Sequence, residues 1–470
     1  MKKNNYGFHK HFKFARQTSG KKGRKLLNSL QKNQSSIINR NCSTHRERTA
    51  GYRFLNNPRV TEKDLVKSLQ NQCRQNCDGL HVIGIQDTTE YNYNRHRNRL
   101  KEDTMGFVGN SDSTGFLAHL MVIFDAGSCL PQGISYCKMW SRTLQHKNKS
   151  RYKTLPIENK ESYRWIEAAD QTKALLDTAK HFTFLSDRES DIYQLWDRVP
   201  DNRTDLIIRA REDRPVFGDE TTVFEILNQS PVEGIYTIEL KEDKRAKRSK
   251  RIARIQVKYA EVAIKKPCRV ALDQVIDDHV VLRVVEAKEM PGNNIEEESL
   301  VHWVLFTTHA VKDFEQACRI IDWYSFRWQI EQFFRLTKST GIDLESSQLE
   351  TGEGLKKLGI LGFSTALRIL QLNLARDGIV NDKVQKFFNP MEVVVLQVLD
   401  KELRGTTIKQ QNPHRKGTLA WASWIIGKLG GYSGYRSQSP PGPMTYKWGL
   451  DKFEQIKIGY YLLKKDVYKE

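Results

Sequence analysis

The chain has 470 residues, of which 39% are hydrophobic and 28% are charged, and its formal net charge at neutral pH is +20. A chain of this length predicts two to four domains, because a single hydrophobic core stops growing at about 250–300 residues. We expect no apolar run to be long enough to span a bilayer, and the polar N-terminus lacks the apolar stretch of a secretory signal. The composition therefore argues against a membrane-spanning protein and against a secreted one.

The cysteines indicate the redox compartment. There are seven, an odd number, and they lack the spacing of a disulfide framework. This usage is typical of reduced thiols in a cytosol, so we expect a cytoplasmic protein. Cys73 and Cys77 are four residues apart, but no second Cys/His pair follows at zinc-site spacing, so we interpret them as helix residues.

Positive charge is concentrated in two blocks. Residues 1–60 contain 15 Lys and Arg against a single acid, Glu47, and so hold +14 of the net charge. The second block consists of Lys244, Arg245, Lys247, Arg248, Lys250, Arg251 and Arg254. Such blocks favour a polyanionic partner. An anionic membrane surface is the competing partner, but neither block has an amphipathic apolar face, so nucleic acid is favoured.

The N-terminal region predicts a small helical domain. Segment 52–58 ends in a turn at Pro58, and Thr61 precedes Glu62 in the manner of a helix cap. Together with its charge, this pattern predicts a basic helical DNA-binding domain over residues 1–76.

Beyond residue 76 the pattern predicts an α/β sheet. A helix is expected over 165–179, and strands are expected over 80–86, 115–124, 133–140, 182–186 and 206–209. The first and fourth of these strands are able to lie side by side in a mixed sheet. Asp87 and Asp187 would then leave the same strand end, where α/β sheets place their ligand sites. His119, inside the second strand, is expected to be packed rather than to ligate a metal.

The stretch 324–338 has a helical apolar period and contains no Gly or Pro, so it predicts one uninterrupted helix. At 100° per residue, its polar face carries Tyr324, Arg327, Glu331 and Lys338, and a separate core-facing side carries Trp323, Phe326, Ile330 and Phe333.

The carboxylates of Asp87 and Asp187, at neighbouring strand ends, would repel each other without a cation. A third from Glu331 completes an oxygen-rich site for Mg²⁺ or Mn²⁺. Each of these features also has a purely structural interpretation when it is taken singly. The polar face fits a set of ion-paired, solvated residues. Asp187 fits a helix cap, and Asp87 fits a turn residue at a strand end.

The remaining segments complete the predicted organisation. Alternating runs over 213–300 predict an antiparallel β insertion, and 301–308 returns as a strand that contains Trp303. Helices are expected over 354–376, 391–403 and 421–429. A final apolar stripe, suited to a partner helix or to intrachain packing, comprises Leu450, Phe453, Ile456, Tyr460 and Leu463. The predicted domains are 1–76, a catalytic core over 77–212 and 301–378, the insertion 213–300, and a helical dimerisation domain 379–470.

The ordered motifs resemble those of the bacterial cut-and-paste insertion-sequence transposases with the YREK signature. Tyr324, Arg327, Glu331 and Lys338 stand at the spacing of that signature. Asp87-Thr88-Thr89 resembles the first catalytic segment of the family. The run 187–191 resembles its second segment, with Ser190 in place of the small Ala.

The resemblance implies a ribonuclease-H-like mixed α/β sheet with an antiparallel β insertion, flanked by helical N- and C-terminal domains. It also implies two Mg²⁺ ions, replaceable by Mn²⁺, held by Asp87, Asp187 and Glu331. One ion would lower the pKa of the attacking water or 3′-OH, and the other would stabilise the leaving oxygen. The DNA contacts that it implies are Arg53, Arg209, Trp303, Tyr324, Arg327 and Lys338.

The function implied by the resemblance is that of a DDE transposase. Such an enzyme excises its element by phosphodiester hydrolysis and hairpin formation and then joins the 3′ ends to target DNA. The expected partners are double-stranded DNA and a second copy of the chain in a synaptic complex, at the bacterial nucleoid and without a membrane. Two alternatives stay open: a metal-dependent nuclease of the same fold without strand transfer, and an inactive transposase-derived DNA-binding protein.

Overall fold

Parallel pairing between two short apolar strands sets the frame of the fold. β1 (His81–Asn92) and β5 (His181–Ser186) pair in parallel, with His81 opposite His181 and Ile85 opposite Leu185. On its other side, β5 pairs in parallel with β6 (Thr204–Arg209). The expectation that the first and fourth predicted strands are neighbours is therefore confirmed.

The structure, a computed structural model, describes residues 23, 26–27, 29–30, 35–42, 44–101, 104–109, 113–143, 155–240, 250–268, 276–291, 300–338, 341–379, 382–435 and 439–467. Most of the basic N-terminal residues, and Lys244, Arg245, Lys247 and Arg248 of the second block, lie outside them. The chain forms two compact units. The strand-rich unit comprises Gly79–Asp87 and Gln145–Gln329, and the helical unit comprises Met1–Asp78, Thr88–Leu144 and Ile330–Glu470.

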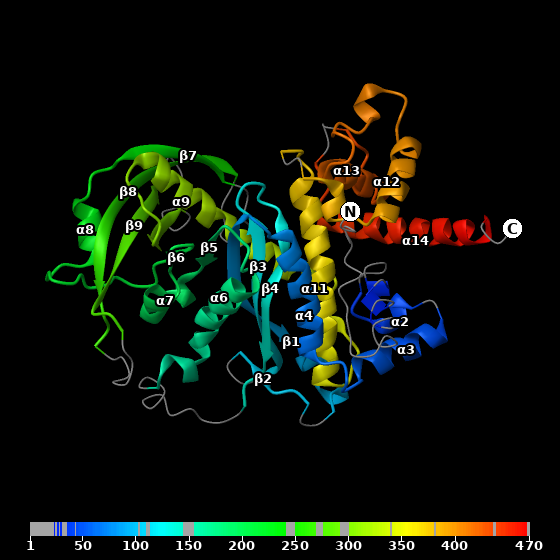
Figure 1. The fold of residues 1–470 in the computed structure, drawn as a ribbon, viewed down its shortest axis with the longest axis horizontal. Coiled ribbons are helices and arrows are strands. Elements are labelled where there is room, and N and C mark those ends of the chain that lie inside the picture. The colour runs from blue at the N-terminus through cyan, green and yellow to red at the C-terminus, as the bar shows by residue number, and fades with distance from the viewer. Residues whose placement is uncertain are drawn as a thin grey trace. The chain divides into compact units, whose positions relative to one another are not determined.

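The strand-rich unit contains a sheet in the order β1–β5–β6–β10–β9–β8–β7. Figure 1 labels all of these strands except β10. Its later strands are β7 (Gly234–Leu240), β8 (Arg251–Lys265), β9 (His279–Glu289) and β10 (His302–Thr307). These four pair with one another in antiparallel fashion, and β10 is antiparallel to β6. The predicted β insertion is thus confirmed, and β10 joins it to the parallel strands in one sheet.

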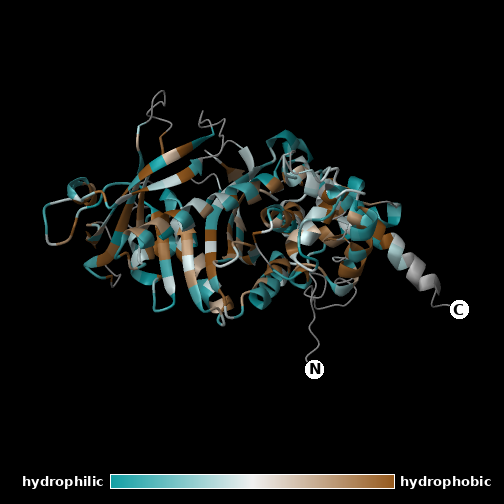
Figure 2. Cartoon of the chain, turned by 90° about the horizontal axis from the view of Figure 1, so that it is seen from above, coloured by the Kyte–Doolittle hydropathy of each residue, from teal (hydrophilic) through white to brown (hydrophobic). Residues whose placement is uncertain are grey.

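Apolar residues explain why these strands are buried. Phe182, Phe184 and Leu185 of β5 and Leu206, Ile207 and Ile208 of β6 are all at most 1% exposed, and Figure 2 shows hydrophobic positions recurring along the strands. A near-continuous apolar run is typical of a parallel strand covered on both faces. The helices of this unit are α6 (Arg164–Leu175), α7 (Tyr193–Arg198), α8 (Val223–Gln229) and α9 (Phe314–Phe326), and its 3₁₀ turns are η3 (Ile157–Asn159), η4 (Glu161–Tyr163) and η5 (Arg188–Ser190).

In the helical unit, an antiparallel pair of long strands lies beside the second half of β1. The two strands are β3 (Ser113–Asp125) and β4 (Pro131–Trp140), and the two-residue strand β2 (Phe107–Val108) pairs with the start of β3. β1 belongs to both units, because its residues up to Asp87 lie in the strand-rich one. The strand order β4–β3–β1–β5–β6, with β1, β5 and β6 parallel, is that of a ribonuclease-H-like mixed sheet, so the predicted fold class is confirmed.

Helices make up the rest of the helical unit. They are α2 (Ile38–Asn41), α3 (His45–Leu55), α4 (Glu62–Asn76), α10 (Trp328–Thr337), α11 (Gly352–Ala375), α12 (Pro390–Glu402), α13 (Leu419–Leu429) and α14 (Pro443–Val467), with 3₁₀ turns η2 (Asn94–Arg99), η7 (Leu344–Ser346), η8 (Val384–Lys386) and η9 (Ile408–Gln410). The predicted cap at Thr61 is present. Its side chain accepts from the Asp64 N–H while the Asp64 carboxylate accepts from the Thr61 N–H. This capping box starts α4, which packs on β4.

Helix α11 corrects the expectation that no segment is long and apolar enough to span a bilayer. By length and composition it is, but 89% of its most apolar window is buried inside the structure. It contacts α3, α4, α13, α14 and β4 within the helical unit. α11 is therefore the central core helix of that unit.

The predicted single helix over 324–338 is interrupted, which is a second correction. α9 ends at Phe326 and α10 begins at Trp328, because the Arg327 N–H bonds the Tyr324 carbonyl at 2.9 Å, three residues back rather than four. Arg327 itself keeps right-handed helical backbone angles, φ −50° and ψ −32°, so the interruption is one residue long. The C-terminal stripe on α14 is also mixed, with Leu450 and Phe453 buried and Ile456 39% exposed.

Candidate active site

Two aspartates stand at the carboxyl ends of adjacent parallel strands. Asp87 lies in β1, and Asp187 follows β5 directly. Each lies six residues beyond a member of the register pair His81–His181. In-register parallel strands bring residues at equal offsets to the same level of the sheet. The strand geometry expected for the two carboxylates is therefore present, while their role remains a prediction.

Asp187 has a local structural role as well. Its Oδ1 accepts a hydrogen bond of 2.9 Å from the Glu189 N–H and so caps the short turn η5. An ionised carboxylate offers about four acceptor positions on its two oxygens. Capping and metal binding are consequently compatible at this residue.

Asp87 faces a guanidinium from α9. Arg327 Nη1 lies 4.0 Å from Asp87 Oδ2, and the two side chains are 15% and 18% exposed. That separation is longer than the hydrogen-bonded contact of a strong ion pair. The same guanidinium lies 5.9 Å from the Tyr324 ring centre and hydrogen-bonds the Tyr324 side chain.

Tyr324 is more buried than its place on a polar helical face predicted, with 4% of its surface exposed. Burial raises the pKa of its phenol, although Arg327 and Arg209 oppose this shift. Burial also lowers the pKa of Arg209, whose charge is partly supported by Tyr324 and Asp187. These mutual effects place Asp187, Arg209, Tyr324 and Arg327 in one electrostatic neighbourhood.

Trp303 lies at the start of β10, beside the end of β6. Its ring meets the Tyr324 ring edge-on, with centroids 5.3 Å apart, and is only half-buried. Arg209 Nη2 donates to the carbonyl of His302 at 3.0 Å. The strand-rich unit thus assembles six of the predicted site residues, the strand-end cluster: Asp87, Asp187, Arg209, Trp303, Tyr324 and Arg327.

The other three predicted residues belong to the helical unit. Glu331 lies in the first turn of α10, four residues after Arg327, and is half-buried. Lys338 follows α10, and its Nζ is 5.5 Å from the centre of the Tyr91 ring. Arg53 is exposed on α3.

The acidic motif that contains Asp187 also holds a structural acid that the sequence did not single out. Asp191 has a fully buried side chain, and its Oδ1 accepts from Arg214 Nη2 at 2.7 Å and from Trp196 Nε1 at 3.3 Å. Its Oδ2 accepts from the Arg211 N–H at 2.9 Å. Asp191 therefore ties the chain after η5 to the chain after β6. Its position in the motif was the available signal, but nothing in the sequence marked Arg214 as its partner.

Ser190 has a supporting role in the same turn. Its hydroxyl donates to the Asp187 carbonyl at 2.8 Å and lies 2.5 Å from Ser186 Oγ. The serine that departs from the resembled motif thus stabilises the turn after Asp187. His119, expected to be packed, is fully buried, and its Nδ1 lies 2.9 Å from Thr88 Oγ1.

The strand-end cluster combines groups that suit phosphate chemistry. Its two carboxylates offer the hard oxygen ligands that Mg²⁺ and Mn²⁺ prefer. Its two guanidiniums are partly desolvated, which strengthens their attraction for phosphate oxygens. The donor set therefore fits a divalent cation with a phosphodiester beside it.

No family model matches the sequence. Among solved structures, the chain is similar to the piggyBac transposase in a synaptic complex with hairpin DNA, with 12% sequence identity and a TM-score of 0.36. The alignment covers 84% of this chain and 73% of that chain. Similarity at this level identifies neither an activity nor a site residue.

Proposed function

We propose that the chain is a DNA transposase that excises an insertion sequence and joins its 3′ ends to target DNA. The observation that carries the proposal is the strand-end cluster. Asp87 and Asp187 leave adjacent parallel strands, with Arg209 and Arg327 beside them. Two acids at adjacent strand ends with cations beside them fit metal-dependent phosphodiester chemistry.

Under this proposal the chain is a transposase of the YREK type. The motifs resemble those of the YREK transposases over roughly residues 45–460, among them the transposase of the bacterial kanamycin-resistance composite transposon. Under this proposal the protein works in the bacterial cytoplasm at the nucleoid, as a homodimer that pairs two element ends.

The residues proposed to hold two Mg²⁺ ions are Asp87, Asp187 and Glu331. When bound, the ions would supply an activated water or 3′-OH and stabilise the leaving oxygen. Asp187 keeps one oxygen engaged with η5, which fixes the orientation of its carboxylate. Glu331 would add the third carboxylate from the first turn of α10.

The cationic and aromatic residues are proposed to position DNA. Arg209 and Arg327 would bind phosphates beside the scissile bond, and the buried phenol of Tyr324 holds the Arg327 guanidinium in place. Lys338 and Arg53 would contact the DNA backbone from the helical unit. Trp303, half-buried at the edge of the cluster, offers a flat ring on which an unstacked base would stack.

The test uses purified full-length protein, a labelled duplex that carries an inverted repeat flanking the gene, and a plasmid target. With Mg²⁺ or Mn²⁺ present, we expect a nick, a hairpin and a strand-transfer product in that order on a denaturing gel. Glu331→Gln keeps the shape of the side chain and removes its charge. This variant is expected to bind the duplex and to leave it uncut.

Three outcomes separate the candidates. Cleavage without strand transfer indicates a nuclease of the same fold. Specific binding of the duplex without cleavage by the wild type indicates a DNA-binding protein. Wild-type cleavage rates in the Glu331→Gln variant would remove Glu331 from the site.

A further inference from the structure

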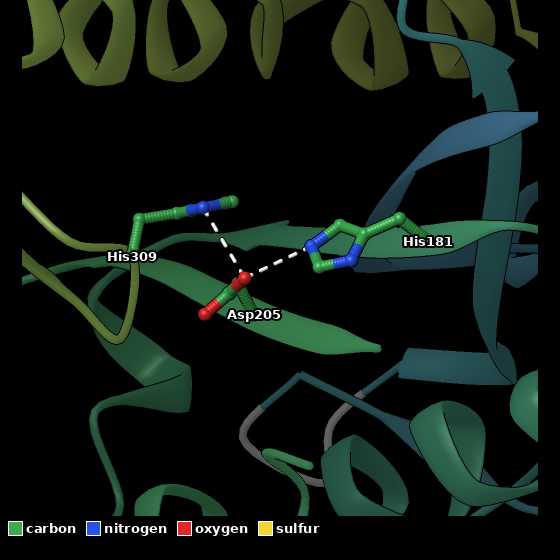
Figure 3. Close-up of side chains that lie close together, drawn as sticks. All are labelled: His181, Asp205 and His309. Carbon is green, nitrogen blue, oxygen red and sulfur yellow. Dashed lines mark hydrogen bonds and ion pairs between the residues drawn. The ribbon is translucent and has the colours of Figure 1, made fainter. Parts of the chain in front are cut away.

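A second cluster lies at the amino ends of the same parallel strands (Figure 3). His181 begins β5, Asp205 is the second residue of β6, and His309 follows β10 by two residues. His181 Nε2 lies 2.9 Å and His309 Nδ1 lies 3.2 Å from the same oxygen, Asp205 Oδ2. Three residues far apart in the chain thus point ligand atoms at one place.

The spacing of these atoms suits a metal ion. One ligand atom from each residue lies within 4.8 Å of the other two. Zn²⁺ binds imidazole nitrogen and carboxylate oxygen at about 2.0–2.2 Å, which places neighbouring ligands of a tetrahedral site about 3.4 Å apart. The two carboxylate–imidazole separations, 2.9 and 3.2 Å, would lengthen by a few tenths of an ångström on binding, and the two imidazole nitrogens, which lie within 4.8 Å of each other, would adopt a similar spacing.

Two threonines orient His309 and Asp205 by hydrogen bonds to the atoms that do not face the proposed ion. Thr183 Oγ1 is 2.9 Å from His309 Nε2, which leaves Nδ1 of that ring directed at Asp205. Thr308 Oγ1 donates to Asp205 Oδ1 at 2.8 Å, which leaves Oδ2 directed at the two imidazoles. Metal-binding histidines and carboxylates are characteristically oriented by such hydrogen bonds to their second ligand atoms.

The surroundings allow an ion to enter. The side chains of His181, Asp205 and His309 are 28%, 20% and 14% exposed.

We propose that His181, Asp205 and His309 bind a transition-metal ion, best matched by Zn²⁺, at the end of β5 and β6 opposite the strand-end cluster. Two imidazoles and one carboxylate suit Zn²⁺, whereas Mg²⁺ prefers oxygen ligands alone. The ion would tie β5 and β6 to the segment between β10 and α9, the helix that carries Tyr324. The site is independent of the proposed transposase activity.

The experiment measures Zn²⁺ binding directly. Chelator-treated full-length protein is titrated with Zn²⁺ by calorimetry in excess Mg²⁺, which occupies the oxygen-ligand site. We expect one Zn²⁺ per chain, and a Co²⁺ absorption spectrum typical of tetrahedral coordination. His181→Ala and His309→Gln should each weaken Zn²⁺ binding at least tenfold, the lower end of the loss caused by altering even a supporting residue.

Matched controls separate this site from other histidines and thiols. His302→Ala removes an imidazole whose Nε2 is 2.8 Å from Glu286 Oε1, a His–carboxylate pair outside the one three-ligand group found among the described residues. Cys73→Ser removes a thiol whose sulfur lies 3.9 Å from that of Cys77. Both variants should bind Zn²⁺ as the wild type does.

Thermal melting keeps the test decisive if a variant folds poorly. Zn²⁺ should raise the melting temperature of the wild type and of His302→Ala but not that of Asp205→Asn. The proposal is overturned if the wild type binds no Zn²⁺, or if binding survives His181→Ala and His309→Gln. The cluster would then be a hydrogen-bonded network that Thr183 links to His81, whose Nε2 is 2.9 Å from the same hydroxyl.

Discussion

The two ends of three parallel strands form two chemically different clusters. At the amino end, β1, β5 and β6 contribute His81, His181 and Asp205, whereas at the carboxyl end they contribute Asp87, Asp187 and Arg209. Six residues of extended strand span about 20 Å. The comparison shows how the same strands carry an imidazole site at one end and a carboxylate site at the other.

Replacing one acid at the carboxyl end should have the largest effect on DNA cleavage. Asp187→Asn should slow DNA cleavage by about 10³-fold or more, equivalent to about 4 kcal/mol, because a divalent cation loses a charged ligand. The same variant should bind Zn²⁺ unchanged, since its amino-end ligands are intact. Single-turnover cleavage and calorimetry measure the two effects.

The matched control for that variant is Glu189→Gln, two residues further on. Glu189 is 65% exposed and pairs with Arg164 at 2.9 Å, outside the strand-end cluster. The Glu189→Gln variant should cleave DNA at the wild-type rate. Equal losses in the two variants would show that the turn as a whole, rather than Asp187, supports cleavage.

Asp191 is a structural acid in the same motif as Asp187, the candidate catalytic acid. Asp191→Ala leaves the Arg214 guanidinium buried without its main partner, so it should lower the free energy of unfolding by about 3–5 kcal/mol. Asp187→Asn should lower it far less. Urea unfolding followed by circular dichroism checks both values, and similar losses would contradict the division of roles.

Trp303 tests whether the carboxyl end handles a distorted duplex. Stacking of a base on an aromatic ring contributes about 1–3 kcal/mol, so Trp303→Ala should slow hairpin formation by about 10–100-fold relative to the first nick. Trp303→Phe should restore part of the rate. If nicking and hairpin formation fall together with the melting temperature, the ring serves packing against Tyr324 alone.

The smallest expected effect is at the amino end. Thr308→Val removes the hydroxyl that donates to Asp205 Oδ1 and should weaken Zn²⁺ binding about tenfold, as loss of an orienting hydrogen bond does elsewhere. Cleavage of the end duplex should not change. Unaltered Zn²⁺ affinity in this variant would mean that Asp205 is oriented by its other contacts.

Local patterns in the sequence predicted most of the fold. Alternating or continuous apolar runs identified β1, β3, β4, β5 and β6, because burial of a strand face depends on a two-residue period. The helix cap at Thr61 could also be predicted, because Thr61 and its partner Asp64 are only three residues apart in the sequence. The expectation that Asp87 and Asp187 follow neighbouring strands also came from the order of the elements.

Only the tertiary structure decided features that depend on contacts between distant segments. Tyr324 is buried and its ring contacts Trp303 of β10, which the period of its own helix does not reveal. The helix break at Arg327 occurs in a stretch without Gly or Pro, so no local signal marks it.

The amino-end cluster gives the clearest example of the same limit. In the sequence, His181, Asp205 and His309 are isolated polar residues with no metal-site spacing. The pairing of β5 with β6 brings the first two together, and the pairing of β10 with β6 carries the chain on to His309. The sequence by itself determined which residues form strands, whereas the register between strands decided which side chains meet, because register is set by the packing of whole sheet faces.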